Sequence, residues 1–155
     1  MHWNEIPAES LAVLRRGSVI PAHLLALDAQ RRLDERRQRA MTRYYLDAGA
    51  GGLAVGVHST QFAIREEGLY EPVLQLAMRT AQDWEPLGGR RPLFMVAGVA
   101  GRTGQAVREG QVARGLGYHA ALLSLGAMKG ASDGELVEHC RAVAAVMPVV
   151  GFYLQ

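Results

Sequence analysis

The segment Pro148-Val149-Val150-Gly151-Phe152-Tyr153-Leu154-Gln155 is an almost continuous apolar run at the end of the chain. Short apolar runs bounded by proline or glycine are typical of strands that are buried on both faces of a parallel sheet. Four earlier apolar runs are each followed by a segment with helical spacing of apolar residues. The sequence therefore predicts an α/β fold with about four βα units and a fifth strand.

The same patterns place the other elements. Strands are expected at 18–27, 53–57, 92–99, 119–125 and from 148 onward. Helices are expected at 7–16, 34–49, 68–84 and 103–115, and Ser132 or Asp133 is expected to cap a last one. We expect Thr103 to cap the helix at 103–115. Parallel strands joined by right-handed helical crossovers form either a (β/α)8 barrel or an open doubly wound sheet, and periodicity does not choose between them.

Length and composition limit the classes of protein that fit. The 155 residues are one domain's worth of chain, well short of the ~250 residues of a complete (β/α)8 barrel. With 17 basic and 15 acidic residues, the net charge of +2 is too balanced to indicate nucleic-acid binding. The longest apolar stretch, 142–154, is shorter than the ~20 residues of a membrane span, and no signal peptide is visible. The single cysteine, Cys140, predicts a reducing compartment, for which the cytoplasm is the default.

Several segments, in order, resemble the dihydrodipicolinate synthase / N-acetylneuraminate lyase family of class I aldolases. They carry an opening strand with an aspartate that begins the next helix, a passage from that helix into the second strand, a third strand ending in Ala-Gly-Val, an entry into the fourth strand, and a fifth strand. These segments lie at 19–22 and 32–34, at 47–56, at 92–99, at 115–122 and at 148–153. The likeness runs from about Gly17 to the end of the chain.

The resemblance implies a partial TIM (β/α)8 barrel, with residues 1–155 as a single domain that forms its amino-terminal portion. It also implies a lyase that binds a small 2-oxo acid such as pyruvate as a Schiff base, without a cofactor, and a homo-oligomer. The lysine that forms this Schiff base belongs to strand six of the family fold and has no counterpart here. The sole lysine, Lys129, is expected in a solvated loop after the fourth strand. We therefore expect the chain to be inactive by itself.

The loop after the second strand is the first candidate binding site. Family members place a glycine, two threonines, a glycine and a glutamate there, and these groups hold the substrate carboxylate. This chain has Gly56, with Val57 and His58 in place of the threonines, followed by Ser59 and Thr60. Backbone amides would survive these changes, whereas a hydroxyl at Val57 would not, so Ser59 or Thr60 is expected to replace it.

Tyr153 is the candidate catalytic residue, because the resemblance implies a tyrosine near strand five that shuttles protons to the bound 2-oxo acid. A core aromatic in a strand is the alternative reading. A second tyrosine, which the family usually carries after strand four, is absent from the segment 124–128. No metal site is expected, since His58 has no carboxylate or histidine partner at a suitable spacing.

Two further segments have simpler readings. Gly98, Gly101, Arg102 and Thr103 resemble a phosphate-binding turn but lack the full glycine fingerprint, and Gly98 is more simply a turn residue. The segment 65–67, which contains Arg65 and two glutamates, is expected to be a solvated loop.

The sequence is compatible with three functions. The first is the amino-terminal half of a carbon–carbon lyase. The second is a non-catalytic half-barrel interaction protein that homodimerises and so covers its sheet edges, which would otherwise offer unpaired backbone groups to a neighbour. The third is a small doubly wound domain that binds an anion or a nucleotide.

Overall fold

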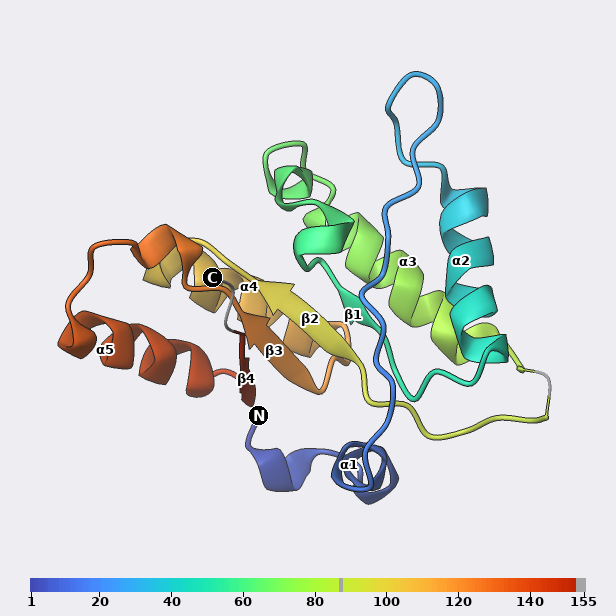
Figure 1. Cartoon of the computed structure of the whole chain (residues 1–155), viewed down its shortest axis with the longest axis horizontal. Helices are drawn as coiled ribbons and strands as arrows, with labels where there is room; N and C mark the ends of the chain where they lie inside the picture. The colour runs from blue at the N-terminus through green and yellow to red at the C-terminus, as the bar shows by residue number, and fades with distance from the viewer. Residues whose placement is uncertain (87, 153–155) are drawn as a thin grey trace.

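Parallel strands form the centre of the structure, and helices connect them (Figure 1). The computed structural model describes residues 1–86 and 88–152. Within these residues the strands are β1 (Ala54–Val55), β2 (Val96–Val99), β3 (Ala120–Leu123) and β4 (Val149–Gly151). The α-helices are α1 (Ala8–Arg15), α2 (Glu35–Asp47), α3 (Tyr70–Asp83), α4 (Thr103–Gly115) and α5 (Asp133–Ala144). Short 3-10 helices lie at Trp3–Glu5, His58–Thr60, Phe62–Arg65 and Gly126–Met128.

The described sheet has the order β1-β2-β3-β4, and each neighbouring pair is parallel. Val96 of β2 lies opposite both Ala54 of β1 and Ala120 of β3. The helices α3, α4 and α5 make the crossovers between successive strands. The predicted alternation of strands and helices is therefore confirmed.

The first expected strand, 18–27, is the exception, because it is an extended segment and not a regular strand. It runs beside β1 through one parallel bridge between Ala22 and Ala54, where the His23 amide donates to the Ala54 carbonyl at 2.8 Å. Pro21 accepts a hydrogen bond from the Ala54 amide at 3.0 Å but has no N–H to return. The ladder is consequently too sparse for a strand, although the segment occupies the expected edge position.

The two faces of the sheet have different surroundings. Val55, Ala97 and Leu123 point toward the helices and belong to a large buried cluster that includes Leu74 of α3 and Ala113 of α4. The alternate residues point to the opposite face. There Val96 and Ala120, near the amino ends of the strands, pack against Ile6, which precedes α1, and Val13 of α1. Toward the carboxyl ends, the described residues provide no helix over this second face (Figure 1).

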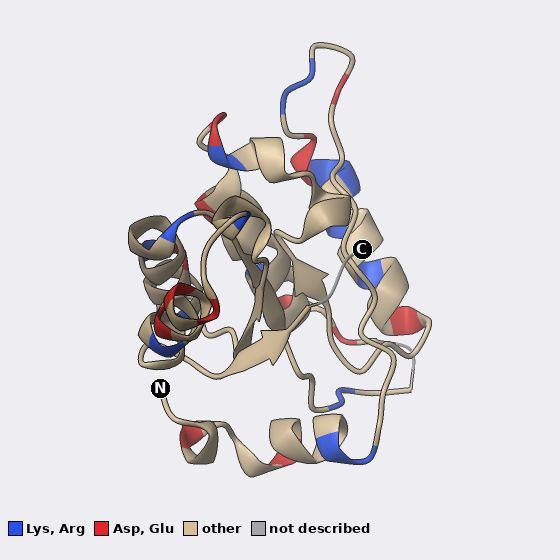
Figure 2. Cartoon of the chain, turned by 60° about the vertical axis from the view of Figure 1, so that its left-hand side comes forward, with Lys and Arg blue, Asp and Glu red and all other residues tan. Residues whose placement is uncertain are grey.

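Charged residues lie outside the described strands. Figure 2 shows the acidic and basic residues on helices and loops, and the residues of the four described strands include none of them. No helix in the described ranges is long and apolar enough to cross a membrane.

Side-chain caps explain where α2 and α5 begin. Asp34 accepts a hydrogen bond from the Arg37 amide at 3.0 Å, and Ser132 forms a capping box with Glu135, so both begin their helices as predicted. The prediction for α4 was wrong, because its cap is Arg102 and Thr103 is its first residue. The Thr103 hydroxyl lies 2.9 Å from His139 Nδ1 on α5 and therefore joins two helices instead of capping one.

A buried histidine fastens the extended segment to α2. The His23 ring is fully buried, with Nε2 at 2.8 Å from the Thr42 hydroxyl and Nδ1 at 2.8 Å from the Gln38 side-chain nitrogen. Gln38 also accepts a hydrogen bond from the Ala26 amide at 2.7 Å. Burial lowers the pKa of His23, because the charged imidazolium would lose its hydration inside the protein.

This lowered pKa predicts acid destabilisation. Below a pH of about 6.5 an unfolded chain protonates His23 while the folded chain keeps it neutral, so the free energy of unfolding should fall between about pH 7.5 and 5.5. His119 and His139, whose pKa values burial also lowers, should act in the same direction. Urea unfolding across this range should give a smaller slope against pH for His23→Gln than for the unaltered chain. His2→Gln, at an exposed position, is the matched control for the histidine-to-glutamine change. An unchanged slope in His23→Gln would contradict the assignment.

Candidate functional site

The loop 56–60 leaves the carboxyl end of β1, which is the edge where parallel α/β folds place their binding sites. Gly56 has a φ of +77°, and a Cβ at this position would lie 2.9 Å from a methyl carbon of Leu74. Glycine is therefore required both by the backbone conformation and by the close packing of α3. The chain then enters the 3-10 helix His58–Thr60, which turns it away from the sheet.

The two hydroxyl groups of this loop have different roles. Thr60 is fully buried, and its hydroxyl donates to the His23 carbonyl at 2.6 Å and accepts from the Gly56 amide at 3.0 Å. These bonds hold the loop against the extended segment, so the Thr60 hydroxyl has a structural role. Ser59 and His58 are exposed, and the His58 ring packs edge-on against Phe62 with centroids 5.7 Å apart.

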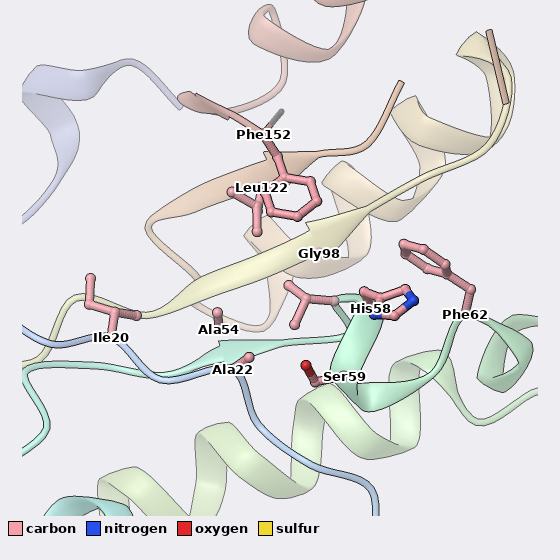
Figure 3. A pocket seen from close by; sticks show the side chains of 10 residues that line it. Ile20, Ala22, Ala54, His58, Ser59, Phe62, Gly98, Leu122 and Phe152 are labelled. Atoms are coloured by element: carbon pink, nitrogen blue, oxygen red, sulfur yellow. The ribbon is translucent and has the colours of Figure 1, made fainter. Parts of the chain in front are cut away.

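A pocket of about 250 Å³ opens on the uncovered face of the sheet, and we call it the sheet-face pocket (Figure 3). Val57, His58 and Ser59 line it, whereas Gly56 and Thr60 do not. The other lining residues come from the extended segment, the strands and the segment after β1. The full lining is Ile20, Ala22, Ala54, Val57, His58, Ser59, Phe62, Gly98, Leu122 and Phe152.

Tyr153, the predicted proton shuttle, lies outside the described residues. Its neighbour Phe152 lines the pocket. Lys129 is exposed, follows the 3-10 helix Gly126–Met128 and is not part of the pocket wall. Within the described ranges, no three His, Cys, Asp or Glu side chains are grouped so that they could hold a metal ion.

A buried ion pair beneath the site was missed by the sequence analysis. The solvated loop predicted at 65–67 is wrong for Arg65, although Glu66 and Glu67 are exposed. Arg65 Nε and Nη2 each lie 2.9 Å from a carboxylate oxygen of Glu109 on α4, and the two side chains are 10% and 9% exposed. One signal was available, because Glu109 shares the inward stripe of α4 with Ala106, Gly110 and Ala113. A carboxylate in such a stripe requires a buried partner.

The same arginine joins the ends of two strands. Its Nη1 donates to the Gly56 carbonyl at 3.2 Å and its Nη2 to the Gly98 carbonyl at 3.1 Å. The Tyr70 hydroxyl also donates to the Gly98 carbonyl, at 2.8 Å, and the Tyr70 ring lies 4.7 Å from the guanidinium carbon. Burial is the larger of two causes that raise the pKa of Tyr70 well above its usual range, and the negative charge of the nearby Glu109 carboxylate is the smaller one. Tyr70 is therefore a fixed hydrogen-bond donor and not a source of protons.

In the turn after β2, the backbone amide that could bind a phosphate already donates to a side chain of the protein. The Ala100 amide donates to Glu109 at 3.0 Å, and Gln105 donates to the same carboxylate at 2.8 Å. A phosphate would need that amide and would face the negative charge of Glu109. The geometry therefore favours the simpler reading of Gly98 and Gly101 as turn residues.

The sequence matches no protein-family model and no curated protein. Solved structures do share its fold. Dihydrodipicolinate synthase from Oceanobacillus iheyensis aligns over 88% of this chain and 44% of that one, with a TM-score of 0.76 and 14% identity. N-acetylneuraminate lyase from Fusobacterium nucleatum aligns over 88% and 46%, with a TM-score of 0.76 and 18% identity.

A third similar structure is a prophage protein of the dihydrodipicolinic acid synthase family from E. coli K12, solved in complex with pyruvate. It aligns over 88% of this chain and 44% of that one, with a TM-score of 0.75 and 16% identity. The chain thus spans less than half the length of the solved structures it matches. The comparisons confirm the expected fold, that of the amino-terminal part of a TIM-barrel aldolase.

The buried ion pair predicts a large effect on stability. Glu109→Gln should lower the free energy of unfolding by about 3 kcal/mol or more, because it leaves the Arg65 charge buried without its counter-charge. Glu138→Gln is the matched control, since Glu138 pairs with Arg141 at 2.7 Å and these side chains are 71% and 72% exposed. Urea denaturation should show a shifted midpoint for the first variant alone. Equal midpoints for both variants would contradict the role of the pair.

The close approach of β1 and β2 predicts a second effect. Gly98→Ala should cost about 2 kcal/mol or more, because its Cβ would meet the Gly56 carbonyl and lie 2.6 Å from the Val57 amide nitrogen. Gly134→Ala on α5, where no atom lies within 4 Å, should leave stability unchanged or slightly increased. Thermal unfolding of the two variants measures the difference. A Gly98→Ala chain as stable as the original would show that the strand ends can separate.

Proposed function

We propose that the chain is the amino-terminal half of a dihydrodipicolinate synthase-like carbon–carbon lyase and that it binds a small 2-oxo acid such as pyruvate. The observation that carries this proposal is the sheet-face pocket, whose wall includes Val57, His58 and Ser59 at the carboxyl end of β1. One solved structure of similar fold holds pyruvate, which supports a ligand of this class. In this proposal the carboxylate of the 2-oxo acid binds next to the loop 56–60.

The residues of the loop support anion binding in two ways. The His58 imidazole and the Ser59 hydroxyl lie on the pocket wall and can donate hydrogen bonds to a carboxylate. Arg65, although cationic, is committed to Glu109 and to two backbone carbonyls and does not line the pocket. We propose that the carboxylate is held by the imidazole and hydroxyl donors of this loop, not by a guanidinium.

The chemistry that follows binding needs groups from elsewhere. A Schiff base requires an amine with a lowered pKa, and a guanidinium cannot replace it. Lys129 is exposed and does not line the pocket, so we propose that these 155 residues bind a 2-oxo acid without activating it. Tyr153 keeps its proposed role as a proton shuttle in the complete enzyme. No cofactor enters this proposal.

A homodimeric interaction protein is the second candidate function. Val150 and Phe152, on the edge strand β4 and just after it, are 36% and 39% exposed, so the uncovered face of the sheet continues to an apolar edge. A second copy of the chain would cover that edge. We propose a homo-oligomer on this basis, and a cytoplasmic location on the basis of the single cysteine.

Calorimetric titration of the purified chain with pyruvate tests the principal proposal. The double variant His58→Ala, Ser59→Ala should weaken pyruvate binding about tenfold, because it removes both side-chain donors on the wall. His2→Ala, which changes an exposed histidine far from the loop in sequence, should leave the affinity unchanged.

A second measurement tests whether the chain forms a Schiff base with pyruvate. Borohydride added with pyruvate should leave the intact mass unchanged, since no Schiff base forms. A reduced adduct on Lys129 would contradict the proposal. So would an affinity for pyruvate that is the same in the double variant as in the unaltered chain.

A further inference from the structure

The lining of the sheet-face pocket is mostly apolar. Only two of its ten lining residues, His58 and Ser59, have polar side chains, and none is an Asp, Glu, Lys or Arg. The apolar side chains come from separate parts of the fold, with Ile20 on the extended segment, Leu122 on β3 and Phe152 after β4. Their convergence therefore results from the tertiary structure and not from one hydrophobic stretch of sequence.

The two polar side chains of the wall are neighbours in the sequence, and Phe62 packs against one of them. Figure 3 shows His58 and Ser59 toward one side of the pocket, with Ile20 at the opposite end and Leu122 beside Phe152. A ligand that fills this pocket would place an anionic head near His58 and an apolar body against Leu122. The volume of about 250 Å³ is many times the ~30 Å³ that a water molecule occupies in the liquid, and it leaves space beyond a methyl group.

Val57 adds to the apolar surface of the pocket. Its side chain is buried and contributes an apolar surface directly beside the polar loop residues. A hydroxyl group on the body of the ligand would lose its hydration against Val57 and Leu122 without gaining a partner there. A second anionic group would lack a counter-charge, because the nearby guanidinium of Arg65 is bound to Glu109.

We propose that the sheet-face pocket selects 2-oxo acids that carry a branched or aromatic apolar substituent, in preference to pyruvate and to hydroxylated 2-oxo acids. This inference rests on the proposed function, because it assigns the substrate class of the same site. The carboxylate and 2-oxo group lie next to His58 and Ser59, and the substituent lies against Leu122 and Phe152.

Calorimetric titration of the unaltered chain with three ligands tests the inference. The ligands are pyruvate, 3-hydroxypyruvate and 4-methyl-2-oxopentanoate, which share the anionic head and differ in the substituent. The branched ligand should bind at least about tenfold more tightly than the other two, because burial of a few methyl groups in an apolar pocket is worth that factor or more.

A matched pair of variants locates the preference. Leu122→Asn places an amide in the pocket wall and should bring the affinity for 4-methyl-2-oxopentanoate down to that for pyruvate. Val137→Asn makes the same kind of change on α5, where the side chain is 47% exposed and outside the pocket, and it should keep the preference. Because the ligand comparison uses the unaltered chain, it remains decisive if Leu122→Asn does not fold.

The outcomes separate the two proposals. If pyruvate binds at least as tightly as the branched ligand, the inference is overturned and the proposed function stands. If none of the three ligands binds, both are overturned. A folded Leu122→Asn chain that keeps the preference would show that another part of the surface selects the substituent.

Discussion

The buried ion pair between Arg65 and Glu109 constrains the structure around the site more than any other interaction. A guanidinium that is only 10% exposed must satisfy its donors inside the protein, and it does so with the Glu109 carboxylate and the carbonyls of Gly56 and Gly98. The pair therefore connects β1, β2 and α4 at one point. Since a buried pair offers little net stability over an apolar one, its consequence here is the fixed geometry of the two strand ends.

This fixed geometry determines where a ligand can bind. Gly98 cannot carry a side chain because a Cβ there would meet the Gly56 carbonyl, so only backbone lines the sheet-face pocket at this position. Arg65 and Glu109 do not line the pocket, whose wall consists of apolar residues with His58 and Ser59. The division between an apolar pocket and a buried polar network is thus a property of the fold, independent of the reaction that the site serves.

Much of the fold was predictable from the sequence, because apolar periodicity and capping residues are local signals. Asp34 and Ser132 begin helices where they were expected, and α4 has its predicted bounds. The failures involve contacts between distant residues: Thr103 turns toward His139 on α5, and Arg65 pairs with a glutamate 44 residues away. Of the predicted site, Val57, His58 and Ser59 line the pocket, whereas the Thr60 hydroxyl is used by the His23 carbonyl, a bond that no local pattern reveals.

Two-dimensional NMR would detect a 2-oxo acid in the sheet-face pocket residue by residue. The chain would carry labelled backbone amides and methyl groups and be titrated with 4-methyl-2-oxopentanoate. We expect the largest shift changes at the amides of Val57, His58 and Ser59 and at the methyl groups of Leu122. Shift changes confined to another surface, or no changes at saturating ligand concentrations, would contradict this expectation.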